Sequence, residues 1–347
     1  MRKWMLPEQI DDILPAEAER LESLRRTLLD HFRDHGYRLV QPPLIEHLDS
    51  LLTGTGRDLE LQTFKLTDPL SGRLLGVRAD MTPQVARIDA HLLNEPGVTR
   101  LCYAGSVLRT VATGVSQSRE VLQVGAELYG DPGIAADREV LGLLLSALDA
   151  ARVHGLHLDL GHVGVYRALA NGARIAGNGG DTELFAAMRT KDVPAVTELT
   201  ARLLPAWRDA FVALPTLYGP ATEVLNRARA QLPDTPSIAA ALTTLETLSQ
   251  AARDRVDALH IDLADLRGYH YQSGASFSVF TAGEPNAIGR GERYDGIGKA
   301  FGRARPATGF TLDLRQLAGL GSDTNFRMTE RLGSESNFDD PDGSSKT

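Results

Sequence analysis

Residues 101–130 read LCYAGSVLRTVATGVSQSREVLQVGAELYG, and this stretch decides the fold. A strand-like run lies on each side of the small polar loop 110–118, so we expect the two runs to pair antiparallel. Along the second run, every other residue shares one face of the strand. That face carries Gln123 and Glu127, while Arg109 ends the first run. The three side chains are therefore candidates for one functional sheet surface, and a half-solvated strand face without a ligand is the alternative interpretation.

The segments around this hairpin predict an α+β fold. Apolar residues follow Pro15 at helical spacing, and Gly36 is placed to end that helix as a C-terminal cap. A second helical pattern covers residues 137–151. The strand-like runs are, in chain order, 37–40, a hairpin between 64 and 77, 155–160, 268–281 and 308–312, with a glycine-rich segment at 289–298.

Two further segments define the domain organisation. Residues 164–258 are rich in Ala, Leu and Arg and are repeatedly interrupted by proline, which predicts a set of short helices inserted between β-rich parts. Residues 321–347 are polar and charged, which predicts a disordered tail. The rest of the chain, residues 1–320, is expected to form one domain that contains the helical insertion.

The composition excludes several classes of protein. The 347 residues include 37 basic and 45 acidic side chains, and the formal charge of -8 opposes general binding to a nucleic-acid backbone. No run reaches the ~18 apolar residues of a membrane span, and the acidic, proline-containing N-terminus is unlike a signal peptide. The single cysteine, Cys102, excludes an internal disulfide and a thiolate metal site, and its apolar neighbours predict burial. We expect a cytoplasmic protein with no nucleic-acid or membrane partner.

Common catalytic and metal-binding signatures are absent from the sequence. No Rossmann glycine fingerprint, P-loop or nucleophile elbow occurs. His31 and His35 lie four residues apart on the first predicted helix, but Phe32 replaces the Glu that a zincin carries after its first His. His157 and Asp159 share a strand face with no third partner, so we interpret them as surface or structural groups. The sequence therefore predicts neither a metal ion nor a cofactor.

The type and order of several segments resemble class II aminoacyl-tRNA synthetases, and histidyl-tRNA synthetases in particular. The resemblance extends from residue 8 to about residue 320 and implies an antiparallel sheet flanked by helices. Its segments are GYRLVQPPLIE at 36–46 (motif 1), LGVRADMT at 75–82, the 101–130 hairpin (motif 2), DLRGYHYQ at 265–272 (the histidine-specific signature), and GERYDG at 291–296 with GFTLDL at 309–314, which approach motif 3.

Departures from the synthetase pattern decide which function the resemblance implies. Val111 stands where the family has a Glu that helps to hold ATP, and Gln316 stands where it has an Arg that grips the ATP phosphates. The basic residues of the motif 2 loop are replaced by neutral ones at 115–117, and no anticodon-binding domain follows residue 320. Without these charges, an adenylate-forming transition state lacks its main electrostatic stabilisation. We expect no catalytic residues.

The amino-acid half of the synthetase site is better retained. An α-amino acid needs a guanidinium for its carboxylate and acidic or polar groups for its ammonium, held on rigid strands. The resemblance implies histidine binding by Asp80 and Thr82 (ammonium), Arg109 (carboxylate), Gln123 and Glu127 (ammonium and imidazole), and Arg267 and Tyr271 (the histidine-specific signature).

A synthetase-like domain without ATP contacts resembles the family of ATP phosphoribosyltransferase regulatory subunits. The segments DMTPQVAR at 80–87 and RGYHY at 267–271 are similar to sequence motifs of that family. The resemblance implies a non-catalytic role in the first step of L-histidine biosynthesis, in a hetero-oligomer with a short-form catalytic subunit that needs this chain for activity and is subject to histidine feedback.

Motif 1 in this family builds a two-fold dimer, so the strand around Leu39 and Val40 is predicted to mediate self-association. Two other functions remain open at this point. One is an amino-acid-activating synthetase paralogue, against which Val111 and Gln316 count. The other is a free-standing histidine sensor with no catalytic partner.

Overall fold

The computed structural model describes residues 5–112, 118–175, 180–269 and 271–320. The strands are β1 (Arg38–Leu39), β2 (Ile45–His47), β3 (Phe64–Thr67), β4 (Leu74–Val77), β5 (Thr99–Leu108), β6 (Glu120–Tyr129), β7 (Leu156–His162), β8 (Tyr218–Pro220), β9 (Ala258–Asp262), β10 (Ala275–Thr281), β11 (Gly289–Arg293) and β12 (Ala307–Asp313). The α-helices are α1 (Pro15–Asp34), α2 (Leu48–Leu51), α3 (Arg57–Gln62), α4 (Thr82–Arg87), α5 (Ile134–Ala150), α6 (Val163–Gly172), α7 (Gly180–Arg189), α8 (Val193–Thr200), α9 (Pro205–Ala213), α10 (Ala221–Gln231), α11 (Pro236–Ala252) and α12 (Leu314–Leu320). A π-helical segment η1 (Ile88–Leu93) and the 3-10 turns η2 (Leu214–Thr216), η3 (Arg253–Arg255) and η4 (Ile297–Phe301) complete the elements.

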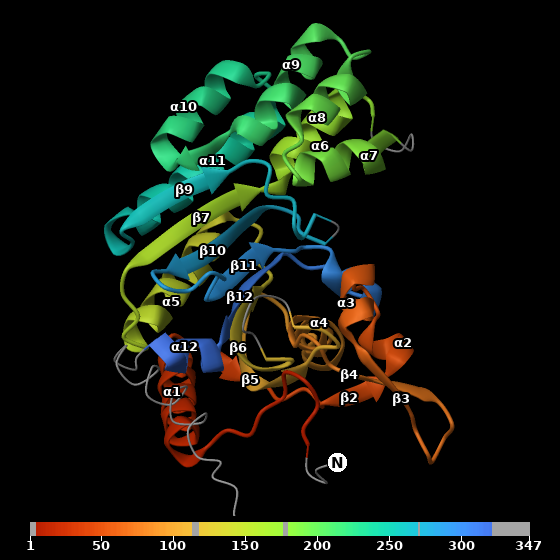
Figure 1. Cartoon of the computed structure of the whole chain (residues 1–347), viewed down its shortest axis with the longest axis vertical. Coiled ribbons are helices and arrows are strands. Elements are labelled where there is room, and N and C mark those ends of the chain that lie inside the picture. Colours follow the sequence, from red (N-terminus) through yellow and green to blue (C-terminus); the bar gives the residue numbers. More distant parts are fainter. Residues whose placement is uncertain (1–4, 113–117, 176–179, 270, 321–347) are drawn as a thin grey trace, which may run out of the picture.

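A nine-stranded sheet in the order β1-β5-β6-β12-β11-β10-β7-β9-β8 forms the framework, and a small sheet in the order β2-β4-β3 stands beside it (Figure 1). Strands β5 and β6 pair antiparallel, as predicted, with Leu101 opposite Glu127. The large sheet is antiparallel, as expected, except in two places, where β1 pairs with β5 and β7 pairs with β9 in parallel. Parallel neighbours require a crossover connection. Helices α6 to α11 provide that crossover between β7 and β9 and gather at one end of the molecule (Figure 1).

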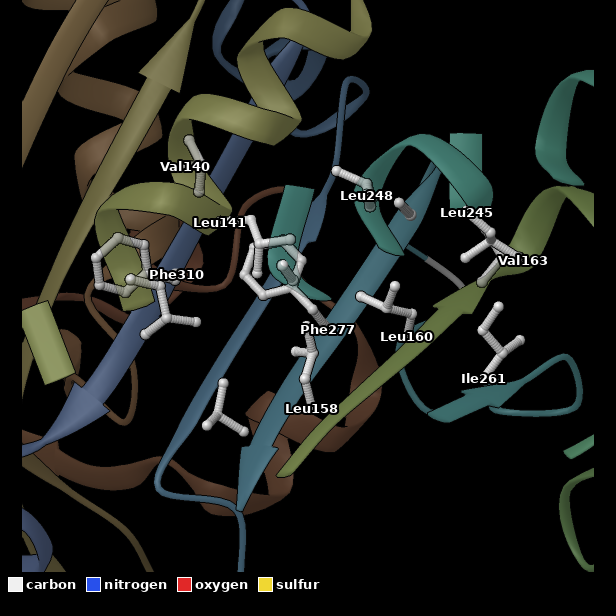
Figure 2. Packing of buried hydrophobic residues seen from close by; sticks show 14 of the residues in the cluster. Val140, Leu141, Leu158, Leu160, Val163, Leu245, Leu248, Ile261, Phe277 and Phe310 are labelled. Atoms are coloured by element: carbon white, nitrogen blue, oxygen red, sulfur yellow. The ribbon is translucent and has the colours of Figure 1, made fainter. Parts of the chain in front are cut away.

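The main core lies between one face of the large sheet and the helices α5 and α11 (Figure 2). Val140 and Leu141 of α5 and Leu248 of α11 face Phe277 of β10 and Leu158 of β7 in this layer. All five side chains are almost completely buried. Each such apolar side chain contributes about 1.5–3 kcal/mol when it is removed from water, so this layer accounts for much of the fold's stability.

A second hydrophobic cluster covers the opposite face of the β5–β6 hairpin. Met81 and Val85 of the α4 region pack there against Tyr103, Val121 and other residues of the cluster. Both faces of β6 are therefore buried. The alternative of a half-solvated strand face is wrong for this strand, because α4 and η4 lie where the solvent would be.

Many local elements agree with the sequence. Helix α1 ends before Gly36, whose φ of +83° favours glycine, and the predicted hairpin between 64 and 77 is present as β3 and β4. The helices predicted between 164 and 258 are present as α6 to α11. Cys102 is buried, as predicted, and burial raises the pKa of its thiol to about 11.

Other predicted elements differ from the structure. The strand expected over 268–281 begins only at Ala275, because the described residues just before it lie in turns and irregular backbone. The first half of the glycine-rich segment is strand β11, in which a Cβ at Gly291 would overlap the Phe277 ring on the neighbouring strand. The predicted disordered tail lies outside the described residues. Within the described part of the chain, no helix is both long and apolar enough to cross a membrane.

Candidate functional site

A cavity of about 530 Å³ opens beside the N-terminus of α4, and it brings together five of the seven predicted site residues. Asp80 and Thr82 enter from the start of α4, Arg109 from the end of β5, and Arg267 and Tyr271 from the turn segment before β10. The volume falls within the range of small-molecule sites in proteins. The two remaining residues, Gln123 and Glu127, lie behind this wall on β6 and contact residues that line it.

Gln123 fixes the Asp80 carboxylate and the backbone that leads into α4. Its Nε2 donates to Oδ1 of Asp80 at 2.9 Å, and its Oε1 accepts a hydrogen bond from the backbone N–H of Met81, also at 2.9 Å. The backbone N–H of Thr82 donates to the same Asp80 oxygen at 3.1 Å. Gln123 is only 3% exposed, so its role is to position Asp80 at the cavity wall.

Glu127 is held in a set of hydroxyl groups under the cavity wall. Thr82 Oγ1 and the Tyr103 hydroxyl donate to its Oε1 at 3.1 and 3.0 Å, and the Tyr294 hydroxyl donates to its Oε2. The side chain is only 1% exposed, and burial raises the pKa of this carboxyl to about 8. Thr82 and Tyr294 line the cavity themselves, so Glu127 is one hydrogen bond away from the cavity through each of these hydroxyls.

Two glycines on the same sheet make room for this group. A Cβ at Gly309 of β12 would overlap Oε2 of Glu127, and a Cβ at Gly125 of β6 would collide with the Tyr103 hydroxyl. Gly309 is paired directly with Glu127 across the two strands. The buried carboxyl therefore depends on small residues on its own strand and on the neighbouring one.

Glu292 is a site residue that the sequence reasoning missed. It projects from β11 into the cavity wall, where Nε2 of Gln272 donates to its Oε2 at 2.6 Å. Burial raises the pKa of its carboxyl to about 7, although hydrogen bonds from Gln272 and Tyr271 oppose this shift. The signal was present in the alternation of glycine and charged residues over 289–292, which is typical of a strand and not of a turn.

Cationic groups complete the cavity. Arg109 lies at the end of β5, where its Nε donates to the carbonyl oxygen of Ala79 at 3.4 Å. Arg267 makes a two-pronged ion pair with Asp265, at 2.8 and 2.6 Å, and its side chain remains 52% exposed. The cavity thus presents guanidinium groups together with the carboxyl groups of Asp80 and Glu292, a combination that suits a zwitterion.

The positions where the synthetase pattern holds ATP carry neutral groups. Val111 is 59% exposed just beyond β5. Gln316 of α12 directs its amide toward the Glu284 carboxylate and the carbonyl oxygen of Asn286, at 3.4 and 3.5 Å. The motif 2 loop positions 115–117 lie outside the described residues. Neither Val111 nor Gln316 offers a cation to a phosphate.

One expectation about metal ligands is wrong. His157 and Asp159 do have a third partner, His260, which lies on the adjacent strand β9. This cluster is separate from the cavity described above. His31 and His35 are near each other on α1, and their rings contact Ser146 and the carbonyl oxygen of His31 respectively.

Comparison with known proteins identifies the relatives of this chain. A family model described as histidyl-tRNA synthetase matches residues 9–317. The ATP phosphoribosyltransferase regulatory subunit of Ralstonia nicotianae is 59% identical over 320 residues, which cover 92% of this chain and 82% of that protein. The protein of the same name from Thiobacillus denitrificans is 58% identical over 322 residues, which cover 93% of this chain and 99% of that protein.

Solved structures share the fold. A protein from Bacillus halodurans, described as an ATP phosphoribosyltransferase regulatory subunit/histidyl-tRNA synthetase, superimposes with a TM-score of 0.81 at 24% identity and covers 96% of this chain and 89% of its own. A histidine–tRNA ligase subunit from Alicyclobacillus acidocaldarius gives a TM-score of 0.72 at 25% identity, over 95% of this chain and 99% of its own. The predicted class II synthetase-like fold is thereby confirmed. The name of the sequence relatives describes a regulatory subunit, in agreement with the non-catalytic role predicted, and the chain belongs to the family of ATP phosphoribosyltransferase regulatory subunits.

Proposed function

We propose that this chain assembles with a short-form ATP phosphoribosyltransferase catalytic subunit, is needed for its activity, and binds L-histidine as part of feedback on the first step of histidine biosynthesis. The observation that carries the proposal is a cavity whose acidic and basic side chains suit an amino acid, in a chain that lacks the synthetase ATP contacts. Asp80 and Arg109 face this cavity, while Val111 and Gln316 occupy the ATP positions. The proposal places the complex in the cytoplasm.

The electrostatics of the cavity support an amino acid with a protonated amine. Asp80, Glu127 and Glu292 are close enough for the Asp80 charge to raise the pKa of both other carboxyl groups. A bound cation relieves this repulsion. The ammonium of a zwitterion would provide that cation, and the guanidinium groups of Arg109 and Arg267, which line the same cavity, suit its carboxylate.

Self-association is part of the same proposal. Leu39 of β1 and the nearby Leu44 and Ile45 are large apolar residues that are each about half exposed, at 50%, 49% and 46%. They belong to motif 1, the segment expected to mediate a two-fold dimer. An apolar surface of this kind favours contact with a second copy, because two-fold dimers use the same patch on both partners.

The decisive experiment measures ATP phosphoribosyltransferase activity of a short-form catalytic subunit with and without this chain, and then titrates histidine into the complex. We expect activity only in the mixture, and inhibition by histidine that is blunted by Asp80→Asn. Activity of the catalytic subunit alone that equals that of the mixture would refute the regulatory role. A complex that is active but equally inhibited with Asp80→Asn would place the histidine sensor outside this cavity.

The free-standing histidine sensor is the second candidate function, because the same cavity would serve it, whereas the regulatory-subunit name of the sequence relatives supports the first candidate. The same experiment separates the two. A free-standing sensor would bind histidine in calorimetry and leave the activity of the catalytic subunit unchanged.

A further inference from the structure

A cluster of metal-ligand side chains lies on the large sheet, away from the amino-acid cavity. His157 and Asp159 stand two residues apart on β7 and therefore share one face. Strand β9 runs parallel to β7 with His260 directly beside Asp159, so its imidazole joins the same face. One potential ligand atom from each residue lies within 4.8 Å of the other two.

The three atoms converge at metal-ligand spacing. Nε2 of His157 is 2.9 Å from Nδ1 of His260 and 3.0 Å from Oδ1 of Asp159, while the remaining pair of atoms is 4.0 Å apart. A point equidistant from all three atoms is roughly 2 Å from each, which matches the bond lengths of divalent zinc to imidazole nitrogen and carboxylate oxygen.

Hydrogen bonds alone satisfy this cluster poorly. A neutral imidazole nitrogen carries either one proton or one lone pair, so Nε2 of His157 pairs well with only one of its two neighbours. Among the described residues, Oδ1 of Asp159 is buried and has no well-aligned hydrogen-bond partner. A cation between the three atoms would pair with all of them at once, because imidazole nitrogens and a carboxylate oxygen are all ligands of divalent cations.

The surroundings leave room for exchangeable ligands. The three side chains are between 35% and 38% exposed, so water reaches the cluster and completes the coordination of a bound ion. The neighbouring carboxylate of Asp262 is engaged by Nζ of Lys191 at 2.7 Å. Asp159 is therefore the one carboxylate in the candidate ligand set, which otherwise consists of two imidazoles.

We propose that His157, Asp159 and His260 form a binding site for a late first-row divalent cation, such as Zn²⁺, that fastens β9 to β7. The two strands mark the start and the end of the long crossover through α6 to α11. An ion bound by residues of both strands would cross-link the two ends of this crossover. Such a link stabilises the folded state because the unfolded chain has no preformed site.

The test is a Zn²⁺ titration of the full chain, prepared without a polyhistidine tag and in the absence of free histidine, since both would chelate the probe. Isothermal titration calorimetry should give one site in the wild-type chain, and Zn²⁺ should raise its midpoint of thermal unfolding. His260→Gln and Asp159→Asn should each weaken binding at least tenfold and abolish most of the thermal shift. His154→Gln, on an exposed histidine near β7, and His31→Gln, on α1, are matched controls that should keep both effects.

Three outcomes would overturn the proposal. They are the absence of Zn²⁺ binding to the wild-type chain, unchanged binding in both cluster variants, and loss of binding in a control variant. Far-UV circular dichroism of each variant separates lost ligation from lost folding. If His260→Gln fails to fold, Asp159→Asn decides the matter, because the substitution keeps the size of the side chain and removes only its charge.

Discussion

The buried carboxyl of Glu127 makes the stability of this protein depend on pH. Burial raises its folded-state pKa to about 8, whereas an unperturbed glutamate in the unfolded chain has a pKa of about 4.3. Between these two values the folded chain retains a proton that the unfolded chain releases. The contribution of this group to stability is therefore fully present below about pH 4 and is lost as the pH rises toward 8.

The size of this effect follows from the two pKa values. A shift of that size corresponds to roughly 3–4 kcal/mol of lost stability between about pH 5 and pH 8. Glu292 acts in the same direction, because burial raises its pKa to about 7. Glu127→Gln removes the proton equilibrium. Tyr103 and Tyr294 donate to different oxygens of the carboxyl, so the carbonyl oxygen of the amide still accepts from one of these hydroxyls and the amide NH2 faces the other. We expect the free energy of unfolding of the variant to depend less steeply on pH than that of the wild-type chain, by most of the Glu127 contribution.

The assay is urea unfolding of the wild-type chain and the variant at several values between about pH 5 and pH 8, with the free energy of unfolding compared at each. The matched control is Glu198→Gln, a change at an exposed position on α8. It should leave the pH dependence of the free energy of unfolding as it is in the wild type. Equal slopes for Glu127→Gln and the wild-type chain would refute the reasoning.

Three further predictions concern ligand binding, catalysis and assembly. Asp80→Asn keeps an oxygen that accepts from Gln123 but removes the negative charge. Calorimetry should therefore show histidine binding weakened on the order of tenfold or more. Unchanged binding would contradict the role proposed for Asp80. Because Val111 and Gln316 provide no cation for phosphate, the chain alone should show no histidine-dependent ATP–pyrophosphate exchange above a buffer blank, and clear exchange would favour the synthetase paralogue. Light scattering at micromolar concentration should give a dimer, which Leu39→Asp should dissociate toward the 37.6 kDa monomer, and a monomeric wild-type chain would disprove the motif 1 interface.

Local patterns in the sequence determined a large part of the fold. The β5–β6 hairpin, helix α1 and the β3–β4 hairpin follow from the strand and helix periods and from the turn residues between them. These features depend on neighbours a few residues apart, so a single sequence contains the information. The grouping of Asp80, Thr82 and Arg109 also followed from the sequence, through the motif order that the chain shares with histidyl-tRNA synthetases.

Other features arise only from contacts between distant segments. The depth of Glu127 is one example, since its strand period does not reveal that α4 and Tyr294 cover the polar face. The role of Glu292 appears only when β11 is placed beside β10 and next to the cavity.

The pairing of His157 with His260 shows most clearly what local sequence patterns cannot reveal and tertiary contacts decide. These residues are 103 positions apart, and only the parallel pairing of β7 with β9 places them side by side. The sequence by itself determined the elements and the chemical groups on each, because helix and strand periods are local. The tertiary structure decided which groups share a site, because strand order and crossover connections depend on packing of the whole chain.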